Sequence, residues 1–229
     1  FDTEPLSFEY APIWLKRIKP FPLSSIPLTP GRLTEPQVQA FFENLLPEGE
    51  LRSYLSVQRK ASTLFSLLQE EAGDTAGAFV MLPQGQKPEA PQYEPTTWES
   101  IANTLKTKSA AAIQIKGEDA RISLAGAQDK ATIAIFDGHT PMLPKGHAPS
   151  THILKPDIRR LAKVRDSAAN EAIIMRTAKH CGLKTAEVFY EPLCKSCVVE
   201  RFDRIRCQDG GLSRVIQYDL CQLAGTVSE

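Results

Sequence analysis

The sequence has no excess charge of either sign, because 27 Lys and Arg residues balance 27 Asp and Glu residues over 229 residues. This balance disfavours a strongly basic nucleic-acid-binding protein. No apolar run approaches the roughly 20 residues that a membrane helix needs, and no signal peptide is recognisable, so we expect no membrane association. The five cysteines all lie between Cys181 and Cys221. Their odd number does not suggest a disulfide framework and favours a reducing, cytoplasmic location.

What is present is typical of a globular protein, since 42% of the residues are hydrophobic and 24% are charged. Proline is frequent, at 17 residues, and is crowded into the first hundred positions. Its density at residues 83–95 predicts a surface linker. We therefore expect an α+β protein of two domains: a small α/β module with the trailing linker at residues 1–95, and an antiparallel sheet with one helix at residues 96–229.

Periodicity predicts the elements of the first half. Alternating apolar residues at 6–10 predict a strand, and an apolar stripe at residues 38–46 predicts a helix. Thr34 and Gln37 have the spacing of a capping box for that helix. Further elements are predicted where apolar residues recur: a short helix at 51–55, a helix that Ser62 caps, and a buried strand at 78–82.

The second half begins with a helix that Thr97 caps and continues mainly with strands. The Asp137–Gly138 pair predicts a hairpin turn. Ser167 or Asn170 caps the next predicted helix, which Gly182 ends. The predicted strands cover residues 121–124, 132–136, 151–154, 186–190 and 197–202, and a last helix starts near Tyr218.

The order of these elements has a chemical meaning. The small residues at 125–127 form a turn whose backbone N–H groups can approach phosphate oxygens. Lys155, at the end of the third strand, can neutralise the phosphates, and Glu171 on the following helix can hold that lysine in an ion pair. After the fifth strand, backbone groups can pair with an adenine edge. This order is typical of the small lobe of a protein kinase.

Each of these features alone also has a purely structural explanation. The turn has one glycine where the kinase pattern has three, so an ordinary strand–turn–strand explains it equally well. Lys155 alone fits a solvated charge, and Glu171 alone fits an acid that complements a helix dipole. It is their joint order that favours the kinase interpretation.

Specific strings support the same interpretation. In the first half they are Phe-Glu-Tyr-Ala-Pro-Ile-Trp-Leu at 8–15, Phe-Phe-Glu-Asn-Leu-Leu-Pro-Glu-Gly at 41–49 and Gly-Asp-Thr-Ala-Gly-Ala at 73–78. In the second half they are Ile-Ser-Leu-Ala-Gly-Ala-Gln-Asp-Lys at 122–130, Thr-His-Ile-Leu-Lys at 151–155, Asn-Glu at 170–171 and Val-Glu-Arg-Phe-Asp-Arg at 199–204. With these strings the sequence resembles the HipA family of bacterial serine/threonine kinase toxins over essentially its whole length.

The resemblance implies a role for individual residues. Lys155 is the strand lysine that contacts the nucleotide phosphates, with Glu171 as its ion-pair partner. Ser123 matches the serine that the family autophosphorylates, where a phosphate of about −1.5 to −2 charges would repel bound ATP or displace the loop. The other ATP-binding residues that the resemblance implies are Ala125, Gly126, Ala127, Gln128 and Lys130 in and beside the phosphate loop, and Glu200 and Phe202 at the adenine hinge.

The resemblance also implies reactants and partners: ATP with magnesium, a protein substrate of the aminoacyl-tRNA synthetase class, and a HipB-like helix-turn-helix antitoxin through which DNA is mainly contacted. The family's catalytic Asp, its metal-binding Asn and a second metal-binding Asp follow in a later lobe that this sequence does not include. Asp137-Gly138-His139 starts like that stretch, but no Asn follows at the right place, and a turn explains it better. We therefore expect the ATP-binding half of a kinase, without catalytic or metal-binding residues of its own; the alternative is an inactive partner-binding or ATP-sensing module.

Two other groups of residues are weaker candidates. Cys194 and Cys197 could form half of a zinc site, although a turn between strands explains their spacing better. The further ligands that such a site would need are among His180, Cys181, Cys207 and Cys221. The basic residues Arg159, Arg160, Lys163 and Arg165 could contact phosphate or nucleic acid, but a solvated loop before a helix is the better interpretation.

Overall fold

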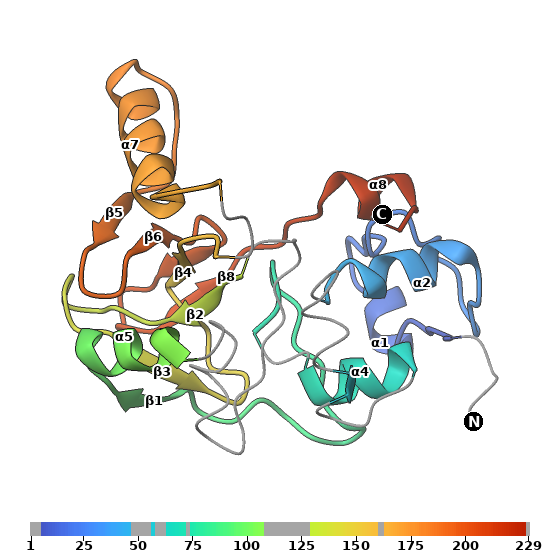
Figure 1. Ribbon diagram of the computed structural model, residues 1–229. Coiled ribbons are helices and arrows are strands. Elements are labelled where there is room, and N and C mark those ends of the chain that lie inside the picture. The colour runs from blue at the N-terminus through green and yellow to red at the C-terminus, as the bar shows by residue number, and fades with distance from the viewer. Residues whose placement is uncertain are drawn as a thin grey trace.

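The computed structural model describes residues 6–46, 56–57, 63–71, 74–107, 129–159 and 163–227. Helices and antiparallel sheets are combined in an α+β fold, as the sequence predicts (Figure 1). The short helices α1, α2 and α4 form one part of the molecule, which we call the amino-terminal module. The strands, with α5 and α7, form the other part, which we call the sheet part.

Aromatic and aliphatic side chains form the core of the amino-terminal module. Helix α2 (Pro36–Glu43) carries Val38 and Phe41 into a cluster with Tyr10 and Ile26, against which α1 (Pro12–Leu15) also packs. The capping box predicted for α2 is wrong, because Glu35 is the N-cap and no side chain caps the helix. Proline at the first helical position replaces the cap, since it has no N–H to satisfy and its φ is already helical.

Other predictions for this module hold only in part. Thr63 lies directly before helix α4 (Leu64–Glu71), and its Oγ1 accepts a hydrogen bond from the Ser66 N–H at 3.1 Å. The predicted cap, Ser62, lies outside the described residues. The strand predicted at 6–10 is reduced to one antiparallel bridge between Phe8 and Leu33. Residues 78–82 form no strand; their apolar character is explained by the packing of Phe79 and Met81 on the module's core. The helix predicted at 51–55 lies outside the described residues.

The main sheet has four antiparallel strands in the order β2-β4-β6-β5. The strands are β2 (Ala131–Ile133), β4 (His152–Pro156), β5 (Val188–Glu191) and β6 (Ser196–Glu200). The sequence predicted each of these to within a few residues. The strand predicted at 121–124 lies outside the described residues.

Two further pairs of strands differ from the sequence-based predictions. Strand β1 (Gln92–Pro95) pairs with β3 (Met142–Lys145), so the predicted linker at 83–95 is irregular only up to residue 91, although most of its residues are exposed, as predicted. Strand β7 (Arg204–Arg206) pairs with β8 (Leu212–Arg214), and neither of these short polar strands was predicted. The domain boundary after residue 95 stays a prediction.

A helix packs on each face of the main sheet. Because side chains alternate along a strand, Leu154 and Val198 lie on one face, where Ile101 and Leu105 of α5 (Trp98–Thr107) cover them. On the other face Cys197 packs against α7 (Ser167–His180) through small residues. Figure 1 shows these two helices at opposite sides of the strands. Asp166 is the N-cap of α7, so the predicted caps Ser167 and Asn170 are wrong, whereas its end at Gly182, with φ +86°, was predicted correctly.

The last helix, α8 (Leu220–Ala224), lies against the amino-terminal module rather than the sheet part (Figure 1). The Gln222 carbonyl oxygen accepts hydrogen bonds from Ser24 Oγ at 2.8 Å and Ser25 Oγ at 2.9 Å. The ring of Tyr218 lies 6.1 Å from those of both Phe41 and Phe79. The module is therefore completed by residues from the other end of the chain. No described helix has the length and apolarity to cross a membrane.

Phe41→Ala is expected to lower the free energy of unfolding by about 3–5 kcal/mol, because it removes a fully buried ring that packs against the rings of Phe79 and Tyr218. Urea unfolding followed by circular dichroism measures this. The control is Phe65→Ala, which removes a ring that is 52% exposed and should change the free energy by no more than about 0.5 kcal/mol. Equal effects of the two changes would contradict the assignment of Phe41 to the core.

Candidate functional site

Lys155 and Glu171, which the sequence suggested as an ion pair, lie together in the structure. Lys155 is on β4 opposite Cys197, and this register directs its side chain to the face that α7 covers. Ala168 and Ala172 are buried where α7 meets the sheet, and these small side chains let the helix approach closely. The distance from Lys155 Nζ to Glu171 Oε1 is 2.5 Å, and the two side chains are 24% and 25% exposed. A cation is thus held at the sheet surface while remaining accessible to solvent.

The two residues predicted for an adenine hinge lie at the end of β6. Glu200 is the last residue of the strand, pairs with His152 and is half-buried. Phe202 is 77% exposed, although its neighbours Arg201 and Asp203 are buried. The backbone of this segment is fixed from both sides, because Glu200 N donates to Glu187 O at 2.8 Å and Arg201 N donates to Thr151 O at 2.9 Å.

The predicted phosphate loop lies outside the described residues. Ala125, Gly126, Ala127, Gln128 and the predicted autophosphorylation site Ser123 lie outside the described residues, so their roles stay predictions. Lys130 is half-buried and lies directly before β2, the strand next to the one that carries Lys155.

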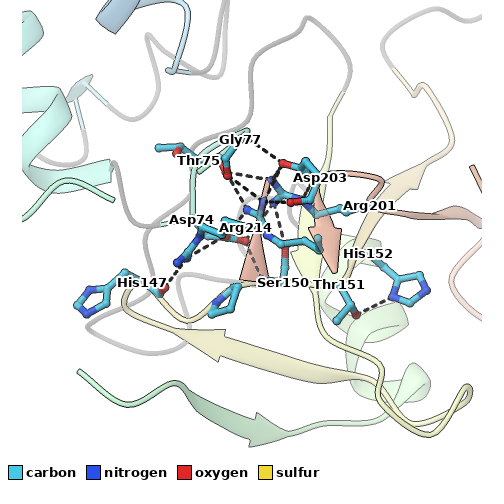
Figure 2. A network of polar contacts seen from close by, with 12 residues as sticks. Asp74, Thr75, Gly77, His147, Ser150, Thr151, His152, Arg201, Asp203 and Arg214 are labelled. Atoms are coloured by element: carbon cyan, nitrogen blue, oxygen red, sulfur yellow. Dashed lines mark hydrogen bonds and ion pairs between the residues drawn. The ribbon is translucent and has the colours of Figure 1, made fainter. Parts of the chain in front are cut away.

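A buried network of charges, which sequence reasoning missed, joins the hinge to the amino-terminal module (Figure 2). We call it the arginine–aspartate network. Asp74 Oδ2 lies 3.1 Å from Arg201 Nη1, and Asp74 Oδ1 lies 2.8 Å from Arg204 Nη2. Asp203 Oδ2 lies 2.7 Å from Arg201 Nη2 and 2.8 Å from Arg204 Nη1. These four side chains are between 1% and 5% exposed, so the charges neutralise one another inside the protein.

The network also satisfies backbone groups of the loop that follows Asp74. Thr75 O accepts from both Arg201 Nη2 and Arg204 Nη2 at 2.9 Å, and the Gly77 N–H donates to Asp203 Oδ2 at 2.8 Å. Burial alone would raise the pKa of Asp74, but the charges of Arg201 and Arg204 outweigh it and hold the pKa below its ordinary value. Asp74 is therefore ionised across the physiological pH range.

Only the Arg201–Asp203 part of this network could have been predicted from the sequence. Arg201 and Asp203 carry opposite charges and are two residues apart, directly after a strand. That pattern could have indicated a local ion pair. Asp74, however, is 127 residues before Arg201, and nothing in a single sequence joins residues so far apart.

His152 is a half-buried histidine beside this segment. Its Nδ1 lies 2.7 Å from Thr151 Oγ1. Burial, helped by the positive charge of Arg206, lowers its pKa to about 4. The imidazole is therefore neutral at physiological pH, and its place on β4 fits a packing residue better than an acid–base group.

The other candidates from the sequence have structural roles. Cys194 packs in the cluster under α5, whereas Cys197 packs under α7, so the two thiols face different cores and do not share a ligand position. No group of three His, Cys, Asp or Glu side chains that could hold a metal is found among the described residues. Asp137 Oδ1 accepts from the N–H groups of His139 and Thr140, which makes 137–140 a turn, as predicted.

The basic segment before α7 is only partly described. Arg159 Nη1 donates to the Leu105 carbonyl oxygen and so links this segment to α5. Lys163 and Arg165 are exposed, in agreement with a solvated loop, and Arg160 lies outside the described residues.

The thiols are expected to fall into two classes. Burial raises the pKa of both Cys194 and Cys197 to about 11, whereas Cys181 and Cys207 are exposed. Because the thiolate is the reactive species, Ellman's reagent at pH 7.5 should modify Cys181 and Cys207 rapidly and Cys194 and Cys197 only after unfolding. Peptide mapping after a short exposure identifies the modified residues, and early modification of Cys194 or Cys197 would contradict their burial.

The low pKa of His152 predicts a loss of stability in acid. Below about pH 6.5 the unfolded chain binds a proton that the folded protein does not accept until about pH 4. The free energy of unfolding should therefore fall through this window, by at most about 1.4 kcal/mol per pH unit from this group. Urea unfolding between pH 7 and pH 4 measures the slope. His152→Gln should reduce it, and His139→Gln, at an exposed turn, should leave it unchanged.

Comparisons with known proteins agree with the resemblance seen in the sequence. The model of the HipA N-terminal domain matches residues 1–82, and that of the HipA-like C-terminal domain matches residues 122–229. The chain is 37% identical to "Putative kinase Y4mE" of Sinorhizobium fredii, over 98% of this chain and 55% of that protein. It is 33% identical to the serine/threonine-protein kinase toxin HipA of Shewanella oneidensis, over 90% of this chain and 47% of that protein.

A solved structure shows the same fold. A chain in the complex of Shewanella oneidensis HipA, HipB and its operator DNA superposes with a TM-score of 0.75 at 29% identity, over 96% of this chain and 51% of that chain. The chain spans about half the length of the curated relatives it matches. Because HipA domain models match both its halves, and its relatives and fold agree with them, the chain is HipA-like.

Proposed function

We propose that this chain supplies the ATP-binding part of a HipA-like serine/threonine protein kinase. The observation that carries the proposal is the Lys155–Glu171 ion pair between a central strand and the helix that packs on it. In protein kinases a strand lysine paired with a helix glutamate contacts the nucleotide phosphates. The alternative, a solvated lysine on the sheet surface, does not account for a glutamate placed to orient it.

The surroundings of Lys155 fit a phosphate ligand. Its ammonium group is partly exposed, and Glu171 holds it near the strand without burying it, so it remains able to bind an anion. Lys130, before the neighbouring strand, adds a second positive charge to the same region of the sheet part. Magnesium would arrive with the nucleotide phosphates, because the described residues offer no group of metal ligands of their own.

The proposal extends to partners by family likeness. The structural relative was solved with HipB and operator DNA, and we propose a HipB-type antitoxin as the partner here, with DNA contacted mainly through it. A protein substrate of the aminoacyl-tRNA synthetase class is proposed from the family resemblance alone. Phosphoryl transfer itself would use residues that the longer relatives have beyond the part matched here.

The test is nucleotide binding by the purified chain. Lys155→Ala should weaken binding of ATP with magnesium at least tenfold, because it removes the charge opposite the phosphates. It should change the free energy of unfolding by about 1 kcal/mol or less, because the ion pair is partly exposed. Isothermal titration calorimetry measures the affinity and circular dichroism the stability.

Lys179→Ala is the matched control for this test. Lys179 lies in the last turn of α7, the helix that carries Glu171, and it also pairs with a glutamate, Glu187. Unlike Lys155, it is not on β4, and its side chain is 52% exposed. Its loss should leave ATP affinity unchanged. No ATP binding by the wild-type chain, or equal losses in the two variants, would contradict the proposed function.

A further inference from the structure

Arg201 lies between the two predicted hinge residues, Glu200 and Phe202, and its side chain is fully engaged. An arginine has five N–H donors, and each of them has a partner here. Nε donates to Asp203 Oδ1 at 2.9 Å. Nη2 donates to Asp203 Oδ2 at 2.7 Å and to Thr75 O at 2.9 Å. Nη1 donates to Asp74 Oδ2 at 3.1 Å and to Ser150 Oγ at 3.0 Å. The guanidinium therefore has one position in which every donor is satisfied.

Asp74 joins the hinge to the strand that carries Lys155. Its Oδ2 atom accepts from Arg201 Nη1 and also from the Ser150 N–H at 2.9 Å. Ser150 is completely buried and lies two residues before β4. One carboxylate oxygen of Asp74 thus accepts hydrogen bonds both from Ser150, just before the Lys155 strand, and from Arg201 in the hinge. Figure 2 shows Asp74, Ser150 and Arg201 converging at this point.

This anchoring accounts for the outward position of Phe202. Arg201 and Asp203 are 4% and 3% exposed because the network holds both side chains inward. The residue between them lies in the turn between β6 and β7, and its side chain is left outside the network. Phe202 is accordingly 77% exposed. If Arg201 lost its partners, the backbone bonds of Glu200 and Arg201 would remain, but no side-chain contact of Arg201 would hold Phe202 in its present orientation.

We propose that Asp74, a residue of the amino-terminal module, is a positioning residue for nucleotide binding. The β4–β6 ladder already places Glu200 beside the Lys155 strand, and Asp74 fixes the next side chain, Arg201, and with it the outward position of Phe202. Adenine and phosphates can then be bound at the same time. This inference rests on the proposed ATP-binding function. The amino-terminal module is then a structural part of the nucleotide site, although it supplies no group that touches the nucleotide.

Asp74→Asn tests the proposal, since it keeps the shape of the side chain and removes its charge. The affinity for the non-hydrolysable analogue AMP-PNP should fall at least tenfold, whereas the affinity for inorganic tripolyphosphate should change less than twofold, because Lys155 keeps its strand and its partner Glu171. A purely structural defect would weaken both ligands equally. Calorimetry is done at a temperature at which circular dichroism shows each variant to be folded.

Val38→Ala is the control, because Val38 is fully buried in the amino-terminal module but lies outside the arginine–aspartate network. It should lower stability and leave AMP-PNP affinity unchanged. If Asp74→Asn does not fold, Ser150→Ala decides the question: it removes one acceptor from Arg201 and should weaken AMP-PNP binding two- to fivefold without changing tripolyphosphate binding.

The outcomes separate the two proposals. Unchanged AMP-PNP affinity in folded Asp74→Asn, or in Ser150→Ala where that variant decides, would overturn the positioning role and leave the ATP-binding function standing. Equal losses for both ligands, or the same loss in Val38→Ala, would also overturn it. Failure of the wild-type chain to bind AMP-PNP would overturn the ATP-binding function, and the positioning role with it.

Discussion

The structure depends on neutralising one carboxylate that has been removed from water. Asp74 is 2% exposed, and an ionised carboxylate so deeply buried is tolerated only with charged hydrogen-bond partners. Arg201 and Arg204 supply them from a segment more than 120 residues later. Removing one member of such a group costs about 3–5 kcal/mol, because its partners stay buried and unpaired. The amino-terminal module and the sheet part are therefore held in one arrangement by a polar contact rather than by apolar burial alone.

A second constraint is the closeness of α7 to the sheet. Ala168 and Ala172 are almost completely buried, and larger residues there would move the helix away from β4 and β6. Because Glu171 lies between these alanines, the same packing that seats the helix also brings the carboxylate within 2.5 Å of Lys155. The ion pair is thus a consequence of helix–sheet packing, and the polar site and the apolar core are set by the same few residues.

The sequence was informative where the determinants are local. Apolar periodicity identified α2, the capping Thr97 marked α5, and Gly182 marked the end of α7. The runs around Leu154 and Val198 identified the two central strands. It failed where the determinants are distant. The N-terminus of α7 is satisfied by Asp157, whose Oδ1 accepts from the Ala168 N–H at 3.0 Å, and not by a residue next to the helix. Strands β7 and β8 are short and polar, so periodicity could not indicate them. Within the candidate site, Lys155 and Glu171 were found from the order of elements, whereas Asp74 required the fold.

The docking of α8 on the amino-terminal module has a consequence for how the protein is made. The hydrogen bonds from Ser24 and Ser25 to Gln222 join residues 198 and 197 positions apart, and contacts this distant slow folding. At a synthesis rate of roughly 5–20 residues per second, Gln222 is added about 10–40 s after Ser24 and Ser25. During that time Phe41 and Phe79 lack the ring of Tyr218. The nascent amino-terminal module therefore presents apolar surface to chaperones until the second half has been synthesised.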